Sequence, residues 1–184
     1  MSEKNDLIFE DSGKVLGQTD GMEGFPSEEW INACCSISSE IISFEEVNNN
    51  LKIIYPELLR TFPQFRLKIV KIKDYPHWQY AENDELNYDK MISIQEEYDD
   101  SIPKSFPLDT NPIWRLHLFN IKEKNEIKFK IYVSHAIADG RSIFLFLDLF
   151  TNISINKKFT DVFEEAKNLP VITSFKKKIF LLMK

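Results

Sequence analysis

VSHAIADGRS, from Val133 to Ser142, is the most informative stretch of this chain. It follows a segment in which apolar and polar residues alternate, and it leads into the apolar run SIFLFLDLF, residues 142–150. Alternation predicts a strand, and a dense apolar run predicts a buried helix. Gly140 lets the chain turn between the two without a side-chain penalty. We therefore expect strand, tight loop and helix, with His135 where the strand ends.

The chemistry of this stretch depends on which way His135 points. Alternate residues of a strand share a face. One face of this strand holds Ile127, Phe129, Ile131 and Val133, and His135 is next in that series. The other face holds Lys128, Lys130, Tyr132 and Ser134. The imidazole is thus predicted to face apolar surroundings. Burial favours the neutral imidazole, which accepts a proton. In a concave site His135 would serve as a general base.

Two other interpretations of His135 stay open on local chemistry alone. The first is a structural histidine at the strand end whose hydrogen bonds are satisfied within the protein. The second places His135 and Asp139 four residues apart on one helix, as a metal-binding pair, but Gly140 and the preceding alternation count against a continuous helix. His77 and His117 stand at no ligand-like spacing from His135, so no metal site is expected.

Asp139 is expected to stabilise the loop after the strand. Its carboxylate would hydrogen-bond within the loop or pair with Arg115 or Arg141, the two arginines considered for it. A base that a second polar group orients is the usual arrangement at acid–base sites.

Composition places the chain among globular proteins. Its 184 residues suit one domain or two small ones, and 43% hydrophobic and 13% aromatic residues argue against disorder. The net charge of −6 lacks the basic surplus of a nucleic-acid-binding protein. The charge is uneven, because residues 157–184 contain seven Lys against three acidic residues.

Cysteine usage and hydropathy predict a cytoplasmic location. Cys34 and Cys35 are adjacent and cannot form an ordinary structural disulfide, which suits a reducing compartment. The polar N-terminus MSEKNDLIFE lacks the apolar core of a signal peptide, and no run of about 18 apolar residues predicts a membrane-spanning helix.

The remaining pattern predicts one layered α/β (α+β) domain. The clearest helix, residues 44–61, begins at a capping box formed by Ser43 and Glu46, and Pro56 predicts a kink or an early end. Strands are expected at residues 30–38, 65–72, 77–81, 91–95, 113–121 and 127–134, with a hairpin turn at 122–126. We expect a mixed, mainly antiparallel sheet flanked by helices at residues 44–61 and 142–150.

Three stretches in the same order along the chain carry a resemblance to a known superfamily. They are LKIIYPELLRTFPQFRLKIV (Leu51–Val70), SFPLDTNPIWRLHLF (Ser105–Phe119) and SHAIADG (Ser134–Gly140). Together they resemble the chloramphenicol acetyltransferase-like, or HxxxD, acyltransferases, which include alcohol acetyltransferases, BAHD acyltransferases and the condensation domains of nonribosomal peptide synthetases. The resemblance covers about residues 10–150.

This resemblance implies an acyl transfer from a coenzyme A or acyl-carrier thioester to an alcohol or amine. His135 would be the general base, Asp139 would hold the motif loop, and Gly140 would supply the turn. No bound cofactor, no metal and no acyl-enzyme are implied. Condensation domains usually have a second histidine where this chain has Ser134, so the resemblance is nearer to the alcohol acyltransferases.

The resemblance extends only to the first half of such proteins. It implies an acyltransferase-like domain at residues 1–156, with residues 157–184 as the start of the crossing toward a second half. Two alternatives to a lone enzyme stay open: a homo-oligomer that completes the site, and a truncated binding or interaction module without turnover. Nucleic acid is not an expected partner.

A third functional interpretation concerns residues 171–184. Lys176 to Lys178 beside the apolar run from Ile179 to Leu182 could rest on an anionic membrane. The alternative, which we favour, is the first part of a helix that packs within a longer protein.

Overall fold

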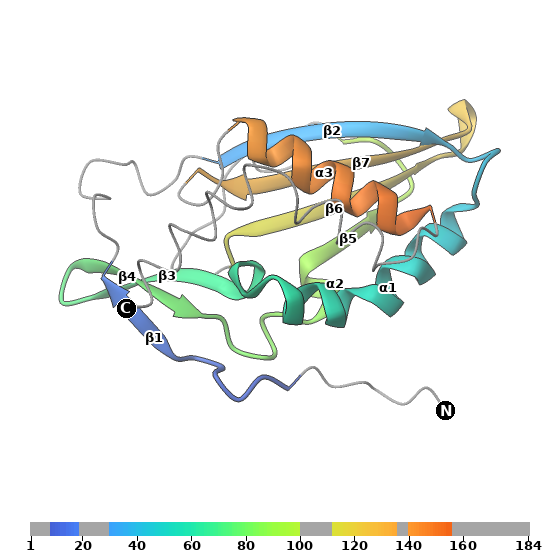
Figure 1. The fold of residues 1–184 in the computed structure, drawn as a ribbon. Helices are drawn as coiled ribbons and strands as arrows, with labels where there is room; N and C mark the ends of the chain where they lie inside the picture. The colour runs from blue at the N-terminus through green and yellow to red at the C-terminus, as the bar shows by residue number, and fades with distance from the viewer. Residues whose placement is uncertain (1–7, 19–29, 100–111, 136–139, 156–184) are drawn as a thin grey trace.

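The structure is a computed structural model that describes residues 8–18, 30–99, 112–135 and 140–155 (Figure 1). In chain order its elements are β1 (Val15–Gln18), β2 (Trp30–Ser38), α1 (Phe44–Thr61), the 3₁₀ turn η2 (Pro63–Arg66), β3 (Leu67–Ile72), β4 (Tyr75–Tyr80), α2 (Tyr88–Met91), β5 (Ile92–Gln95), β6 (Trp114–Ile121), the 3₁₀ turn η3 (Lys122–Lys124), β7 (Glu126–Ser134) and α3 (Gly140–Ser154).

The strands form two sheets. One has the order β2-β7-β6-β5 and the other the order β1-β4-β3. All pairings are antiparallel except that of β5 with β6. The predicted α+β class with mainly antiparallel strands is confirmed, but the single expected sheet is divided into two. Local patterns identify strands without showing which strands pair, because pairing is decided by tertiary contacts.

Helix α1 begins as the sequence predicts. The Ser43 side chain accepts a hydrogen bond from the Glu46 backbone N–H, and the Ser43 backbone N–H donates to the Glu46 carboxylate, each at 3.2 Å. The helix spans Phe44–Thr61, as predicted, and of the two alternatives at Pro56 the early end is wrong. Proline removes the hydrogen bond to the carbonyl of Lys52, a residue on the exposed side of the helix, where water can replace it.

Loss of the α1 cap has a defined expected cost. Ser43→Ala removes the acceptor for an orphan N–H of the first turn and should lower the free energy of unfolding by about 1 kcal/mol. Urea denaturation followed by circular dichroism measures the change. The exposed Ser36→Ala on β2 is the matched control and should change the value by less than about 0.5 kcal/mol. Equal effects of the two substitutions would contradict the role of the cap.

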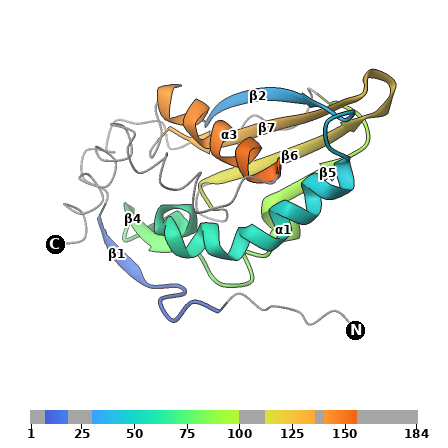
Figure 2. The same ribbon diagram turned by 45° about the vertical axis from the view of Figure 1, so that its right-hand side comes forward.

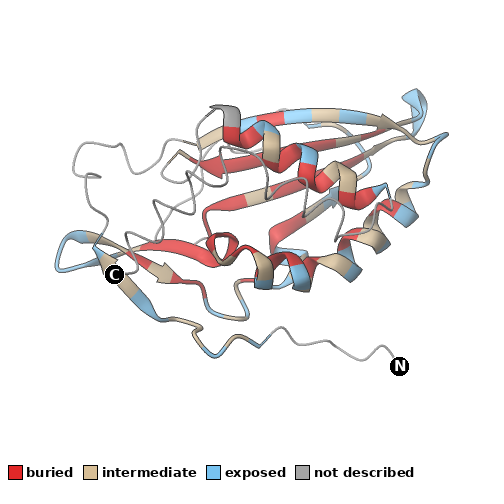
Figure 3. Ribbon diagram, in the orientation of Figure 1, coloured by how far each residue is buried: buried red, intermediate tan, exposed pale blue. Residues whose placement is uncertain are grey.

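The helices cover one face of the four-stranded sheet. Helix α3 packs on β2 and β7, and α1 lies beside α3 (Figures 1 and 2). Figure 3 shows the buried residues between this helical layer and the strands. The apolar run of α3 predicted a buried helix, but its Phe144 is 63% exposed. That side of α3 faces away from the sheet.

An aromatic cluster forms the centre of the core. Trp114 is fully buried, and its ring centroid lies 5.2 Å from those of Phe65 and Phe150. Its indole N–H donates to the Phe65 carbonyl at 2.8 Å. This bond joins the first residue of β6 to η2, the turn that follows α1. The same side chain therefore links α1, the four-stranded sheet and α3.

Arg66 fastens the N-terminal segment to the three-stranded sheet. Its guanidinium lies 4.3 Å from the ring centroid of Phe9 and 4.4 Å from that of Tyr80, and it donates to both carboxylate oxygens of Asp11. Planar stacking combined with a two-point carboxylate contact is a geometry that arginine supplies and lysine does not. The sequence showed no sign of this contact, because its partners lie far apart in the chain.

Several predictions concern residues outside the described ones. These are the loop at 18–28 beyond Gln18, most of the irregular crossing at 98–112, Asp139, and the proposed division at residue 157 with the membrane contact at 171–184. Among the described residues, none of the helices combines the length and the apolar character needed to cross a bilayer.

Candidate active site at the end of strand β7

His135 follows the last residue of the central strand β7. Hydrogen bonds fix the chain at this point, because the Ser134 N–H donates to the Ile113 carbonyl at 2.8 Å, and the Ile113 N–H donates to the Leu67 carbonyl at 3.1 Å. Ser134 also lies opposite Trp30 in the β2–β7 pairing. The backbone before His135 is therefore tied to β2, to the start of β6 and to β3. The predicted position at a strand end is confirmed.

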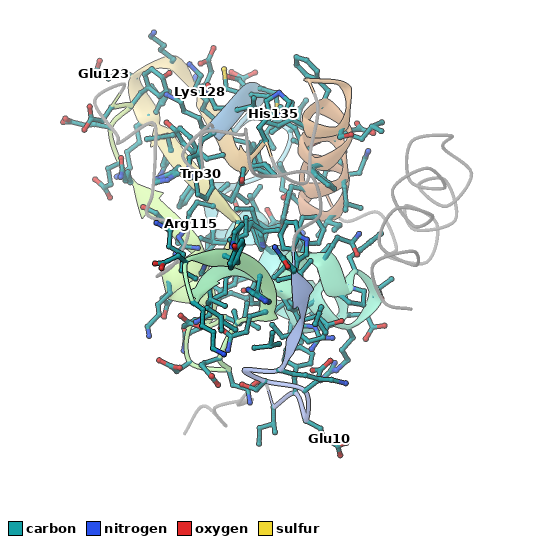
Figure 4. The ribbon with its side chains drawn as sticks, turned by 90° about the vertical axis from the view of Figure 1, so that its left-hand side faces the viewer. Glu10, Trp30, Arg115, Glu123, Lys128 and His135 are labelled. Carbon is teal, nitrogen blue, oxygen red and sulfur yellow. The ribbon has the colours of Figure 1, made fainter. Side chains whose placement is uncertain are left out.

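The side chain of His135 is partly exposed. Figure 4 shows it at the end of the four-stranded sheet, beside α3. Parity predicted an inward-facing ring in apolar surroundings, but the chain leaves the sheet at Ser134 and His135 lies in a turn. The imidazole is thus partly exposed at the end of a central strand, while the backbone on its N-terminal side stays fixed.

The other two motif residues are described only in part. Asp139 lies outside the described residues, so its predicted role stays a prediction. Gly140 is the first residue of α3, which places the helix start where the motif predicts it. The alternative with His135 and Asp139 on one continuous helix is wrong for His135, because that residue lies between β7 and α3.

Arg115, one of the two arginines considered for Asp139, makes contacts within β6 and with α2. Its Nη1 donates to the Trp114 carbonyl at 2.9 Å and lies 3.0 Å from the sulfur of Met91. Burial lowers the pKa of Arg115 below its ordinary value. Arg115 lies opposite Tyr132 in the β6–β7 pairing. Both residues therefore belong to the other sheet face than Val133, the residue two before His135.

The two cysteines are free thiols on opposite faces of β2. Cys34 is exposed, whereas burial, together with the charges of Cys34 and Asp148, raises the pKa of Cys35 to about 11. A thiol with that pKa stays protonated near neutral pH, and the thiolate is the nucleophilic form. Cys35 is therefore not an activated nucleophile.

Solved structures provide the comparison that decides the fold. No protein-family model and no curated protein matches the sequence. TRI101 of F. sporotrichioides, solved with coenzyme A and T-2, matches 86% of this chain with a TM-score of 0.54 and 16% identity. A structure described as holo T3CT matches 84% of the chain at 0.58 and 16% identity, and the tallysomycin biosynthesis protein TlmII matches 72% at 0.50 and 16% identity.

The chain therefore has the fold of these solved structures, and the expected fold is confirmed. The chain spans 44% of the TRI101 chain, 37% of the T3CT chain and 35% of the TlmII chain. The elements described above thus correspond to part of the fold of these longer chains.

The four-stranded sheet has a second buried face, which the sequence pattern did not predict. On the sheet face away from the helices, the residues of β6 and β7 that are less than a tenth exposed are His117, Phe119, Lys130, Tyr132 and Ser134. The motif WRLHLF showed the alternation that produces this face. Alternation distinguishes the two faces of a strand but does not show whether the second one is covered, so no role was assigned to these residues.

His117 should make the protein less stable in acid. Burial, followed by the positive charges of Lys130 and Arg115, lowers the pKa of His117 from 6.5 to about 4. The unfolded chain, with an ordinary histidine pKa, then takes up a proton between those values that the folded protein does not. The free energy of unfolding should be highest above about pH 6.5 and fall by up to about 3 kcal/mol as the pH drops toward 4.

Urea denaturation at several pH values, compared between variants, isolates this histidine from the titrating carboxylates. His117→Gln should lose the part of the pH dependence between pH 6.5 and 4 that the wild type shows. His77→Gln, on the other sheet, is the control and should keep the wild-type slope. Parallel plots of the free energy of unfolding against pH for the wild type and His117→Gln would mean that His117 has the same pKa in the folded and unfolded states, which would contradict this prediction.

Proposed function

We propose that this chain takes part in acyl transfer from a coenzyme A or acyl-carrier thioester to the hydroxyl or amine of an acceptor, with His135 as the general base. The observation that supports this proposal is the position of His135, one residue beyond a fixed central strand and five before the start of α3, in an acyltransferase fold. TRI101, which has this fold, was solved with coenzyme A.

In the proposed step the neutral His135 imidazole takes the proton from the acceptor O–H or N–H. The acceptor oxygen or nitrogen attacks the thioester carbonyl carbon, the C–S bond breaks, and the thiolate leaves with its electron pair. The proton held on the imidazole passes to that thiolate, so the products are the acylated acceptor and a free thiol. Proton transfer of this kind contributes about 10²–10⁴-fold to a rate.

Asp139 and Gly140 would position His135 without touching substrate. Gly140 begins α3 and closes the short connection from β7. Asp139 would brace that connection by hydrogen bonds or by an arginine, which keeps the imidazole in a fixed orientation. Metal chemistry has no part in this proposal, and the described residues hold no group of three or more His, Cys, Asp or Glu side chains suited to a metal ion.

A binding module without turnover is the second candidate. It is favoured by the share of the similar chains that this chain spans, 35% for TlmII and 44% for TRI101. A second copy or another chain would complete the site in an active assembly. In this second candidate the chain alone would bind a thioester or an acceptor, and turnover would need groups from that copy or chain.

A thiol-release assay tests the proposed reaction. The full chain is incubated with acetyl-CoA or longer acyl-CoA donors and a panel of alcohols and amines, and free thiol is followed with a chromogenic disulfide. Thiol release that requires an acceptor supports acyl transfer. If no pair of donor and acceptor gives thiol release, while calorimetry shows that the chain binds an acyl-CoA, the proposed turnover is overturned and the binding module is favoured.

A further inference from the structure

A row of polar side chains crosses the four-stranded sheet on the face away from the helices. Lys130 of β7 lies opposite His117 of β6, and its other neighbour in the sheet is Cys34 of β2. His117 is paired in turn with Ser93 of β5. Side chains of directly opposed residues on one face of a sheet are neighbours. Amine, imidazole and hydroxyl groups therefore gather at the centre of this face.

His117 is the residue of this row whose environment points to a ligand. It is 7% exposed, and neither ring nitrogen has a hydrogen-bond partner among the residues that the structure describes. Its ring is stacked with Phe119 at 6.3 Å and lies edge-on to Tyr132 at 5.3 Å between centroids. A buried polar group without a partner is costly, and such groups in proteins usually mark a functional role or a bound water or ion.

Two positive charges, those of Lys130 and Arg115, act on His117. Lys130 is 7% exposed, and its Nζ lies 5.5 Å from the Tyr132 ring centroid and 5.4 Å from that of Tyr98. Lys128 lies over the Tyr98 ring at 3.8 Å. Both Lys130 and Arg115 disfavour a charged His117. An anion beside the imidazole would reverse this effect, because it attracts the two cations and the protonated ring together.

We propose that this face binds an oxyanion group, a carboxylate or a phosphate, between His117, Lys130 and Arg115. On binding, His117 takes up a proton, so that the imidazolium donates from its ring nitrogens to the anion. Lys130 and Arg115 add charge-assisted hydrogen bonds. The site lies on the sheet face away from the helices, whereas His135 follows the residues of β7 that face the helices. The proposal does not depend on acyl transfer.

Nuclear magnetic resonance of the isotope-labelled full chain tests this site directly. Sodium phosphate and sodium acetate are titrated separately at constant pH and at an ionic strength held with sodium chloride. The ring signals of His117, assigned by their loss in His117→Gln, should shift saturably with at least one anion. The phosphate and acetate arms distinguish a phosphate from a carboxylate ligand.

Charge variants test the second contact. Lys130→Met should weaken the apparent affinity about tenfold or more, since a hydrogen bond to a charged group contributes about 1.5–3 kcal/mol. Lys71→Met removes an exposed charge from β3 and should change the affinity less than about twofold. Lys130→Arg, which keeps the charge, replaces Lys130→Met if that variant does not fold, and it should keep measurable binding.

Two results would overturn the proposal. One is the absence of a saturable His117 shift with both anions in the wild-type protein, a measurement that no variant can confound. The other is equal weakening by Lys130→Met and Lys71→Met, which would mean that the anions act only by general screening.

Discussion

Replacing His135 with alanine should lower acceptor-dependent thiol release by about 10²–10⁴-fold, since that is the usual contribution of a general base. The substitution removes the only group at the end of β7 that the proposal assigns to proton transfer. His135 is partly exposed and follows the last paired residue of β7, so the fold should persist. The loss should therefore appear in the rate, with little change in the free energy of unfolding.

Two controls make the His135→Ala result interpretable. His77→Ala removes a partly exposed imidazole from β4, on the other sheet, and should keep the wild-type rate. Circular dichroism of His135→Ala should match the wild type. If His135→Ala is folded and turns over at the wild-type rate, His135 takes no part in the reaction. That result would leave the assignment of the fold unchanged.

Trp114→Ala should give the largest loss of stability among single substitutions in the core. The side chain is fully buried and contacts the rings of Phe65 and Phe150. Truncation leaves a large cavity and deprives the Phe65 carbonyl of its indole donor, so we expect a loss of about 3–5 kcal/mol. A domain of this size is stable by about 5–15 kcal/mol, so a substantial part of the total would be lost.

Urea denaturation followed by circular dichroism measures the Trp114 effect without relying on tryptophan fluorescence. Trp114→Phe keeps most of the ring volume and should lose only about 1–3 kcal/mol, mainly through the missing hydrogen bond. Phe144→Ala removes an aromatic ring that is 63% exposed on α3 and should cost less than about 1 kcal/mol. Comparable losses from Trp114→Ala and Phe144→Ala would contradict the central position of Trp114.

Local periodicity was enough to predict most elements of the fold. Strand β2 has the predicted bounds Trp30–Ser38, and the predicted hairpin is formed by β6 and β7. The capping box at Ser43 predicted the start of α1 because both of its hydrogen bonds are made by residues three apart. These features depend on neighbours in sequence, which is why the amino-acid sequence alone reveals them.

Features that depend on distant residues could not be predicted in the same way. Pro56 does not end α1, because Tyr55, Leu58 and Leu59 on either side of it are buried in the core. The contact of Arg66 with Asp11 joins residues 55 apart in the chain. The buried position of His117 depends on what covers a second face of the sheet. Each of these required the tertiary structure.

The sequence predicted the position of His135 correctly, but it predicted the surroundings of the His135 ring only in part. The motif placed His135 at the end of a strand, and the structure confirms that position. Parity overestimated the enclosure of the ring, since it assumes that the strand geometry continues beyond Ser134. The polar row at His117 carries no motif, and the alternation of WRLHLF alone did not distinguish it from a solvent-facing surface.

The central claim is that the His135 imidazole contacts the acceptor atom that attacks the thioester. A crystal structure of the chain with an unreactive thioether analogue of an acyl-CoA and an acceptor from the active panel tests it most directly. We predict a His135 ring nitrogen within hydrogen-bond distance, about 2.6–3.2 Å, of the acceptor oxygen or nitrogen. A well-defined acceptor bound elsewhere, with no contact to that ring, would contradict the claim.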